Sequence, residues 1–129
     1  MRSALDRRAL LAGLAGAASA LAGCGRTPRI KPTQALVALS DVPKGGRKNV
    51  LVAGRPVELR RTEEGVAARS LLCSHTGCTV AWREDRRAYL CPCHEGVYDA
   101  DGAVIAGAPT KGLASVPAVV RGDAVVVGS

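Results

Sequence analysis

Short aliphatic runs separated by turn residues make up most of the chain after residue 34. Valine, leucine, isoleucine and alanine fill the runs, and glycine, proline and acidic residues stand between them, which is the pattern of short β-strands. No apolar repeat of helical period reaches a useful length. The pattern predicts strands at residues 35–39, 50–53, 56–61, 66–72, 79–83, 87–90, 97–99, 103–105, 115–120 and 124–127.

Charged and glycine-containing turns join several of these runs into hairpins. We expect the turns at residues 63–65, 84–86, 101–102 and 121–123, and Asp101-Gly102 is a strong signal for a tight turn. A longer loop is expected at residues 41–48. The strand spacing indicates an all-β protein of small antiparallel sheets, either a sandwich or a barrel.

The first 24 residues have a different pattern and resemble a targeting segment that does not belong to the fold. Arg2, Arg7 and Arg8 form a positive end, and the uncharged run at residues 9–23 is shorter than a membrane-spanning helix requires. Residues 21–24, Leu-Ala-Gly-Cys, resemble the bacterial lipoprotein box, in which the cysteine is lipidated and becomes the new N-terminus. An ordinary cleaved signal peptide or an uncleaved short anchor is the alternative.

Export and membrane attachment are the functions that this part of the chain indicates. Arg7-Arg8 followed by Ala-Leu-Leu resembles a twin-arginine export signal, whose route carries folded domains. Residues 25–33 contain three basic residues and two prolines, which predicts an extended tether. We therefore expect an exported protein, held by a lipid on Cys24 at the outer, periplasmic face of the cytoplasmic membrane.

Composition limits the size and the partners of the folded part. The chain has 129 residues, no internal repeat and three aromatic residues, Trp82, Tyr89 and Tyr98, so we expect one small domain at residues 34–129 with an aliphatic core. A domain of this size gains much from cross-links and metal bonds. From Cys24 onward fifteen basic residues stand against ten acidic ones. No basic run is interleaved with aromatic residues, which argues against nucleic acid as a partner.

Cysteine and histidine concentrate in residues 73–94, which contain both histidines and four of the five cysteines. The stretch begins Cys-Ser-His-Thr-Gly-Cys and ends Cys-Pro-Cys-His. Cys73-x-His75 and Cys91-x-x-His94 each offer one thiolate and one imidazole. Such a set serves either one tetrahedral zinc or a two-iron cluster with cysteines on one iron and histidines on the other.

Mixed half-sites favour the cluster, because zinc fingers usually pair cysteine with cysteine and histidine with histidine. Three other interpretations are open: a structural zinc site on the same four residues, a structural disulfide framework, and a redox switch at Cys91 and Cys93. The framework leaves the histidine spacing unexplained. The switch lacks the helix and strand setting of thiol oxidoreductases.

On these residues the chain resembles the Rieske iron–sulfur proteins, whose pattern is Cys-x-His, a spacer of about fifteen residues, and Cys-x-x-His. The resemblance implies one [2Fe–2S] cluster, with Cys73 and Cys91 on one iron and His75 and His94 on the other. It also implies a Rieske fold, in which a cluster-binding subdomain, about residues 73–110, is inserted into a base domain. Finally, Cys78 and Cys93 stand where the quinol-oxidising cytochrome bc type members carry a disulfide between the two loops.

The resemblance extends to neighbours of the expected cluster. Tyr98 stands where the bc type has a tyrosine that hydrogen-bonds a ligand sulfur, and Pro109 lies in a stretch that resembles the loop covering the cluster. Where the bc type usually reads His-Gly-Ser, this chain reads His94-Glu95-Gly96. The serine hydroxyl that bonds a bridging sulfide is missing. We therefore expect a lower reduction potential than in the most oxidising bc-type centres, and we expect Gly96→Ser to raise it.

Together these features imply an electron-transfer component, not a self-contained enzyme. The first hypothesis is the iron–sulfur component of a membrane quinol-oxidising cytochrome bc type chain, with quinol or a redox protein such as a cytochrome as partner. Alternatives are the small Rieske subunit of a periplasmic molybdenum oxidase of the arsenite oxidase kind, and a solitary periplasmic carrier. A zinc-stabilised binding module is the alternative of a different class.

Overall fold

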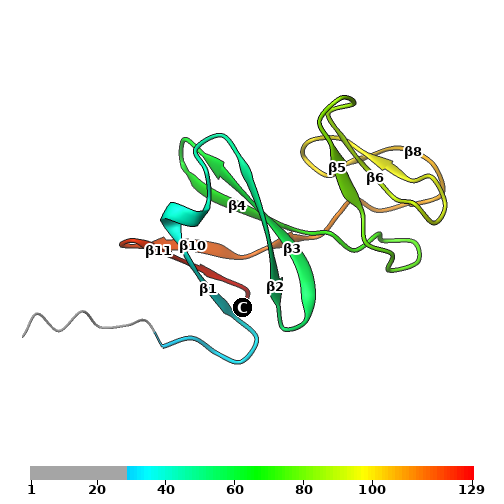
Figure 1. The fold of residues 1–129 in the computed structure, drawn as a ribbon. Helices are drawn as coiled ribbons and strands as arrows, with labels where there is room; N and C mark the ends of the chain where they lie inside the picture. Colours follow the sequence, from blue (N-terminus) through cyan, green and yellow to red (C-terminus); the bar gives the residue numbers. More distant parts are fainter. Residues whose placement is uncertain (1–28) are drawn as a thin grey trace, which may run out of the picture.

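The computed structural model describes residues 29–129, and the predicted signal segment with Cys24 lies outside the described residues. The described residues form eleven strands and one short 3-10 helix, η1 (Leu39–Asp41). The strands make three small antiparallel sheets, which lie next to one another from left to right in Figure 1. The predicted all-β fold class is confirmed. In residues 29–129 no helix is long and apolar enough to cross a membrane.

The first sheet joins the two ends of the described chain. Its strands are, in order, β1 (Ala35–Ala38), β11 (Ala124–Val127) and β10 (Ala118–Arg121). The central strand, β11, buries Val125 and Val127 completely. Beside the sheet, the Thr33 hydroxyl donates to the carbonyl of Ser129. The chain therefore enters and leaves the sheet at the same place.

The second sheet is a meander of three strands with a fourth strand from later in the chain. Its strands are, in order, β2 (Arg47–Val52), β3 (Arg55–Thr62), β4 (Gly65–Ser70) and β9 (Ser115–Val116). Ala53 and Gly54 both have positive φ, 49° and 75°, and form the turn between β2 and β3. Such a turn matches the twist of antiparallel strands.

The first two sheets pack around an aliphatic core, and together they are called the base below. Burial of aliphatic side chains from both sheets stabilises the base. The buried residues of this core are Val42, Val52, Val57, Leu59, Ala68, Val125 and Val127.

The third sheet and its loops, residues 71–113, are called the head below and lie in the chain between β4 and β9. The strands of the head are, in order, β5 (Ala81–Arg83), β6 (Ala88–Leu90), β7 (Val97–Tyr98) and β8 (Val104–Ala106). Trp82, Tyr89 and Tyr98 are partners across β5, β6 and β7, so the three aromatic side chains lie in a row on one face. The buried core around this row consists of Leu71, Cys73, Val80, Tyr89, Cys91, Tyr98 and Leu113.

Two predicted elements of the base differ from the observed ones. The ladder between β2 and β3 extends to Arg47, inside the region predicted as a loop at residues 41–48. Residues 115–120, predicted as one strand, divide at Pro117 because proline has no N–H to donate. On either side of Pro117, β9 pairs with β4 and β10 pairs with β11, so the break moves the chain from one sheet to the other.

Candidate metal centre

Two loops of the head carry the cysteines and histidines of the motif. The first, residues 73–78, precedes β5, and the N–H of Cys73 donates to the carbonyl of Cys78 at 2.6 Å. The second, residues 91–96, connects β6 to β7, and the N–H of Cys91 donates to the carbonyl of Gly96 at 2.8 Å. Both loops turn back on themselves at the same end of the third sheet, where β5, β6 and β7 are aligned.

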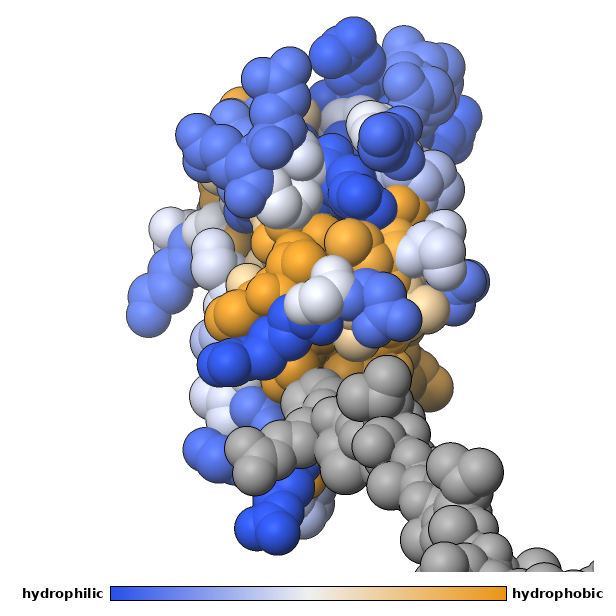
Figure 2. Space-filling view, turned by 90° about the vertical axis from the view of Figure 1, so that its left-hand side faces the viewer, coloured by the Kyte–Doolittle hydropathy of each residue, from blue (hydrophilic) through white to orange (hydrophobic). Residues whose placement is uncertain are grey.

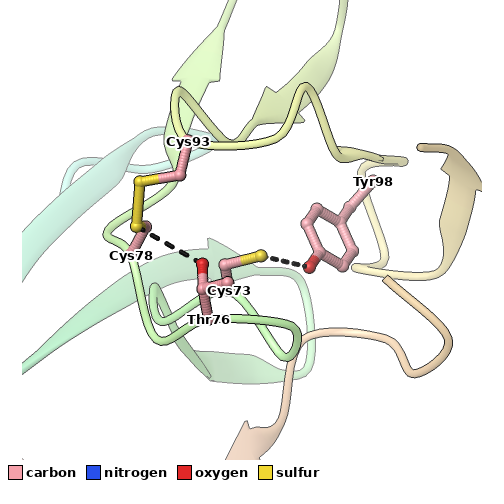
Figure 3. The surroundings of a disulfide bond; sticks show 5 residues. All are labelled: Cys73, Thr76, Cys78, Cys93 and Tyr98. Carbon is pink, nitrogen blue, oxygen red and sulfur yellow. Dashed lines mark hydrogen bonds between the residues drawn. A yellow bond between two sulfur atoms is a disulfide. The ribbon is translucent and has the colours of Figure 1, made fainter. Parts of the chain in front are cut away.

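A disulfide between Cys78 and Cys93 joins the two loops (Figure 3). The Cα atoms of the pair lie 6.5 Å apart. The Thr76 hydroxyl donates to the sulfur of Cys78 at 3.4 Å. The predicted pairing is confirmed, and it fixes the separation of the loops.

Cys73 and Cys91 are buried and are the free cysteines of the described residues. Oη of Tyr98 lies 3.2 Å from Sγ of Cys73 (Figure 3), and the N–H of Ser74 donates to the same oxygen at 3.3 Å. The tyrosine proton has two acceptors within reach, the sulfur of Cys73 and Oγ of Ser74, which lies 3.3 Å away and itself donates to the carbonyl of Lys111. Of the two, the thiolate form of Cys73 is the stronger acceptor because it carries the charge. Sequence reasoning missed Ser74, although it is the middle residue of the Cys-x-His half-site.

Hydrogen bonds around Cys73 favour its thiolate. Burial raises the pKa of Cys73, but the hydrogen bonds from Tyr98 and from the backbone of His75 outweigh burial and lower it. The nearby Cys91 thiol acts in the same direction. Burial and the hydrogen bond to Cys73 raise the pKa of Tyr98, so the tyrosine stays a donor. A lowered thiol pKa suits a metal ligand, since the thiolate is the form that binds.

His75 and His94 are both exposed, and their ring centroids lie 4.9 Å apart with the planes at 88°. The structure therefore places two buried thiols and two exposed imidazoles on the same two loops, with the imidazoles next to each other. A two-iron cluster takes its two kinds of ligand on different irons, and two separate pairs fit that requirement.

One tetrahedral zinc would need all four donors around a single point. Within residues 29–129, no three His, Cys, Asp or Glu side chains are grouped closely enough to hold one metal ion. The preference for a cluster rests on the ligand types, because each half-site mixes a thiolate with an imidazole. The ligand assignment itself, with Cys73 and Cys91 on one iron and His75 and His94 on the other, stays a prediction.

A third loop, residues 107–109, packs against the second ligand loop. A Cβ atom on Gly107 would lie 2.7 Å from the carbonyl oxygen of Glu95, and Gly107 has a φ of +90°. Both the space and the backbone require glycine at this position. Pro109 is buried, and its ring lies beside Gly96 of the second ligand loop. That this third loop covers the cluster stays a prediction.

The packing of Pro109 changes the expectation for Gly96. A Cβ atom on Gly96 would lie 2.7 Å from Cγ of Pro109, so a serine does not fit unless the proline moves. Gly96→Ser therefore strains the contact with Pro109 in addition to any hydrogen bond it adds, and its effect on the reduction potential stays a prediction. The positive φ of this segment, 53°, belongs to Glu95, a conformation that strains a residue with a side chain.

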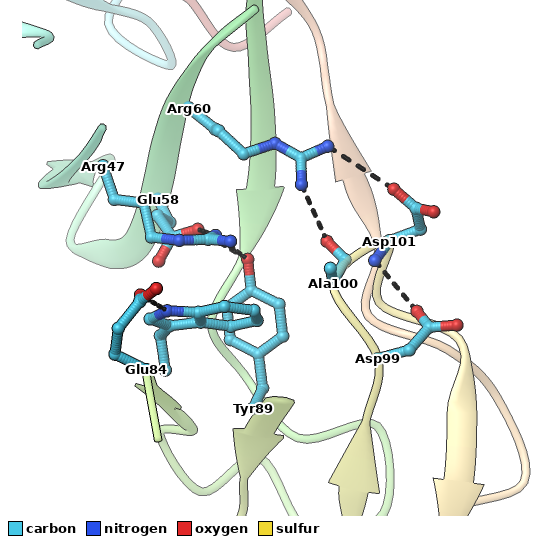
Figure 4. A network of polar contacts seen from close by, with 9 residues as sticks. Arg47, Glu58, Arg60, Glu84, Tyr89, Asp99, Ala100 and Asp101 are labelled. Atoms are coloured by element: carbon cyan, nitrogen blue, oxygen red, sulfur yellow. Dashed lines mark hydrogen bonds and ion pairs between the residues drawn. The ribbon is translucent and has the colours of Figure 1, made fainter. Parts of the chain in front are cut away.

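A polar network joins the head to the base (Figure 4). Arg47 of β2 donates from Nη1 to Glu58 Oε1 at 2.5 Å and to Tyr89 Oη at 2.8 Å. The Tyr89 hydroxyl donates to the same carboxylate oxygen at 2.5 Å, and the Arg47 guanidinium lies 3.6 Å from the centroid of the Trp82 ring. Burial and the hydrogen bond to Glu58 raise the pKa of Tyr89 to about 12.

Sequence reasoning missed this network. Its one signal was Glu58, an acidic residue between Val57 and Leu59 in the predicted strand at residues 56–61, and this side chain is only 4% exposed. A second contact lies nearer the surface, where Arg60 donates to the carbonyl of Ala100 at 3.2 Å and to Asp101 at 3.4 Å (Figure 4).

Residues 33–117 match the family model described as Rieske [2Fe-2S] domain. The chain is 35% identical over 115 residues to the cytochrome b6-f complex iron-sulfur subunit of Parasynechococcus marenigrum (strain WH8102), which covers 82% of this chain and 64% of that protein. The corresponding subunit of Gloeobacter violaceus is 41% identical over 56 residues, 43% of this chain and 30% of that protein. The chain thus spans less than two thirds of the length of these relatives.

The fold is similar to that of a solved cyanobacterial structure, the plasma membrane Rieske protein PetC3 from Synechocystis PCC 6803. The TM-score is 0.56 at 26% identity, and the match covers 65% of this chain and 87% of that one.

Proposed function

The chain belongs to the Rieske [2Fe-2S] family, and from this membership we propose that it is the electron-carrying component of a membrane quinol-oxidising chain of the cytochrome bc type. The observation that carries the proposal is the arrangement of two loops, joined by the Cys78–Cys93 disulfide, that present an exposed pair of imidazoles above a buried pair of thiols. When bound, the [2Fe–2S] cluster takes up and releases one electron.

The residues of the chain prepare this site in three ways. The disulfide fixes the distance between the loops, so little order has to be gained when metal binds. Tyr98 donates to the sulfur of Cys73, and Pro109 packs over Gly96 beside the second loop. His75 and His94 stay exposed, so a quinol hydroxyl or a partner protein can approach the imidazoles directly.

Relatives named as cytochrome b6-f complex iron-sulfur subunits support this partner class over a molybdenum oxidase. Mild detergent extraction followed by affinity purification of the chain tests it. We expect co-purification of a b-type cytochrome. Co-purification of a molybdopterin protein, or of no redox protein, would contradict the assignment.

Metal analysis tests the site itself. We expect two irons and two acid-labile sulfides per chain, and in the reduced state a paramagnetic signal with a low average g value, as mixed thiolate and imidazole ligation gives. One zinc and no iron would end the proposal.

We further propose that the protein is exported folded and held at the outer face of the cytoplasmic membrane by a lipid on Cys24. The support is the sequence of the first 24 residues, which lies outside the described residues. Replacing Arg7 and Arg8 with lysine should leave folded precursor in the cytoplasm, and Cys24→Ala should release the protein from the membrane fraction. Unchanged membrane attachment of Cys24→Ala would contradict the lipid anchor.

A further inference from the structure

The outer face of the first sheet carries an apolar row across its whole width. Leu36 of β1, Val126 of β11 and Val119 of β10 are partners in register, so their side chains lie on the same face. Leu36 is 38% exposed and Val119 is 50% exposed. Figure 2 views this side of the molecule and shows hydrophobic side chains gathered in the middle of the face, with hydrophilic ones around them.

The opposite face of the same sheet already supplies the core. Val125 and Val127 of β11 are fully buried against the second sheet. An antiparallel sheet with one face in the core normally alternates to polar residues on the solvent side. A row of leucine and valine in the solvent positions of all three strands therefore indicates a surface that is covered in the working protein.

The tether reaches the folded part at one end of this face. Residues Arg29 to Thr33 are exposed and carry two cations, Arg29 and Lys31, and they lead directly into β1. Arg121 is exposed on the same side of β10 as Val119. The apolar row is thus accompanied by positive charge, both along the tether and at the far end of β10.

We propose that this face, the row Leu36–Val126–Val119 with its flanking cations, rests on the surface of an anionic lipid bilayer. The proposal depends on the membrane attachment given under the proposed function. Residues 25–33 extend to at most about 30 Å, so a domain tethered at Cys24 stays close to the bilayer. A short tether gives an effective concentration on the order of millimolar, and a contact that is too weak to bind the free domain then suffices. Apolar side chains enter the headgroup boundary while the cations meet lipid phosphates.

This orientation has a consequence for the electron carrier. The first sheet and the head lie at opposite ends of the molecule, with the second sheet between them (Figure 1). When the first sheet rests on the bilayer, the head, which carries His75 and His94, lies at the far end of the molecule. The docked position serves a partner above the membrane, and reaching quinol inside the bilayer requires the face to leave the surface.

Hydrogen–deuterium exchange of the full chain on vesicles tests the proposal. We expect the amides of β1 and of the free edge of β10 to exchange several-fold more slowly on vesicles containing phosphatidylglycerol than in detergent, and high salt to reduce this protection. Leu36→Glu with Val119→Glu should abolish the protection while the protein stays bound through its anchor. The matched control is Leu51→Glu with Ile105→Glu, because these aliphatic residues are 68% and 60% exposed elsewhere on the surface, and it should behave as wild type.

Two results would overturn the proposal. One is equal exchange of the wild type on vesicles and in detergent. The other is protection that persists in detergent together with a dimer in light scattering, because a second copy would then cover the face. If the glutamate variant loses its circular dichroism spectrum, the milder pair Leu36→Ser and Val119→Thr takes its place with the same expectation.

A second version of this test does not depend on lipidation of Cys24. Ser129 is bonded to Thr33, so a C-terminal polyhistidine tail leaves the molecule where the tether does. Cys24→Ala protein held by this tail on vesicles with a nickel-chelating lipid and phosphatidylglycerol should show the same protection. If the tagged protein is protected but the untagged wild type does not bind membranes, the bilayer contact of this face is supported and the lipid anchor is contradicted. Absence of protection in the tagged protein would contradict the proposed bilayer contact of this face and would leave the lipid anchor unaffected.

Discussion

The base and the head are built on different principles. The strands β2, β3 and β4 of the base have six to eight residues each, whereas the strands of the head have two or three. The core of the base is aliphatic, and the core of the head contains two tyrosines and two free cysteines. Long ladders over a valine and leucine core stabilise the base.

The four strands of the head have only two or three residues each, so they contribute few ladder hydrogen bonds. The head therefore depends on cross-links: the Cys78–Cys93 disulfide, the cluster ligands, and the Arg47 network that fastens it to the base. The base should therefore stay folded when the head loses order after the removal of any of these cross-links.

Disrupting the Arg47 network should have the largest effect on stability. Arg47→Ala leaves the buried carboxylate of Glu58 without its cation, and breaking a buried pair costs about 3–5 kcal/mol. Arg60→Ala is the matched control, since Arg60 also reaches from the base to the head but contacts the exposed Asp101, where a pair is worth about 1 kcal/mol or less. Chemical denaturation measures both. Equal losses for the two variants would show that the buried network has no special role.

Removing the disulfide should affect the head alone. The pair closes a loop with a sequence separation of 15 residues, which corresponds to about 3 kcal/mol. With Cys78→Ser and Cys93→Ser we expect an assembled but labile cluster, and faster hydrogen exchange in residues 73–110 than in the base. Equally accelerated exchange in β3 and β11 would break the distinction between the two regions.

The packing of the third loop gives a smaller effect. Gly96→Ser places a Cβ against Pro109, and overpacking costs about 1–3 kcal/mol. Adding Pro109→Ala should recover part of the stability, because the alanine lacks the Cγ and Cδ atoms that conflict. A double-mutant cycle on thermal unfolding measures this coupling, and purely additive losses would mean that the two residues do not conflict.

Loss of the tyrosine hydroxyl should change the potential of the cluster. The hydrogen bond from Tyr98 favours the reduced, more negative state; if it is worth about 1–2 kcal/mol, Tyr98→Phe lowers the potential by roughly 40–90 mV. Tyr89→Phe is the control, because Tyr89 occupies the same aromatic row but bonds Glu58 and Arg47. Protein-film voltammetry should show no change for the control. A shift of equal size in both variants would refute a specific effect of the sulfur contact.

Alkaline pH should have the smallest effect on stability, and it acts on the Tyr89 hydroxyl in the network between the base and the head. The pKa of Tyr89 is raised to about 12, above the value of about 10 in the unfolded chain. Between these values the folded protein holds a proton that the unfolded chain has lost, so stability is complete below pH 10 and falls as pH rises. The loss contributed by Tyr89 is about 1.4 kcal/mol at pH 11. The difference between the denaturation midpoints at pH 8 and at pH 11 should be smaller in Tyr89→Phe than in the wild type. An equal difference in the two proteins would contradict this origin.

The sequence anticipated the motif, the strands and the disulfide for identifiable reasons. Alternating aliphatic runs with glycine and acidic turns predict β-hairpins, and β5–β6 and β7–β8 of the head are of this local kind. The Cys78–Cys93 pair came from the resemblance, since spacing alone leaves several pairings open.

Contacts between distant segments were not predictable in the same way. The conflict at Gly96 depends on Pro109, which arrives from a different loop, and single-sequence patterns do not report which loops touch. The Arg47 network likewise joins β2, β3 and β6, and its members read separately as ordinary strand residues. Pro117 is a local signal, but the exchange of sheets that it permits depends on which partners β9 and β10 find.

The position of Trp82 allows its intrinsic fluorescence to report on the contact between the base and the head. It is the one tryptophan of the chain. Its indole lies against the Arg47 guanidinium and beside the ring of Tyr89, whose centroid is 4.9 Å away. Its N–H donates to Glu84 at 2.6 Å. Because the indole touches a cation from the base and a ring from the head, separation of the two regions changes the emission of this single fluorophore. Movement at the joint can therefore be followed in unlabelled protein, at concentrations far below those that other spectroscopies need.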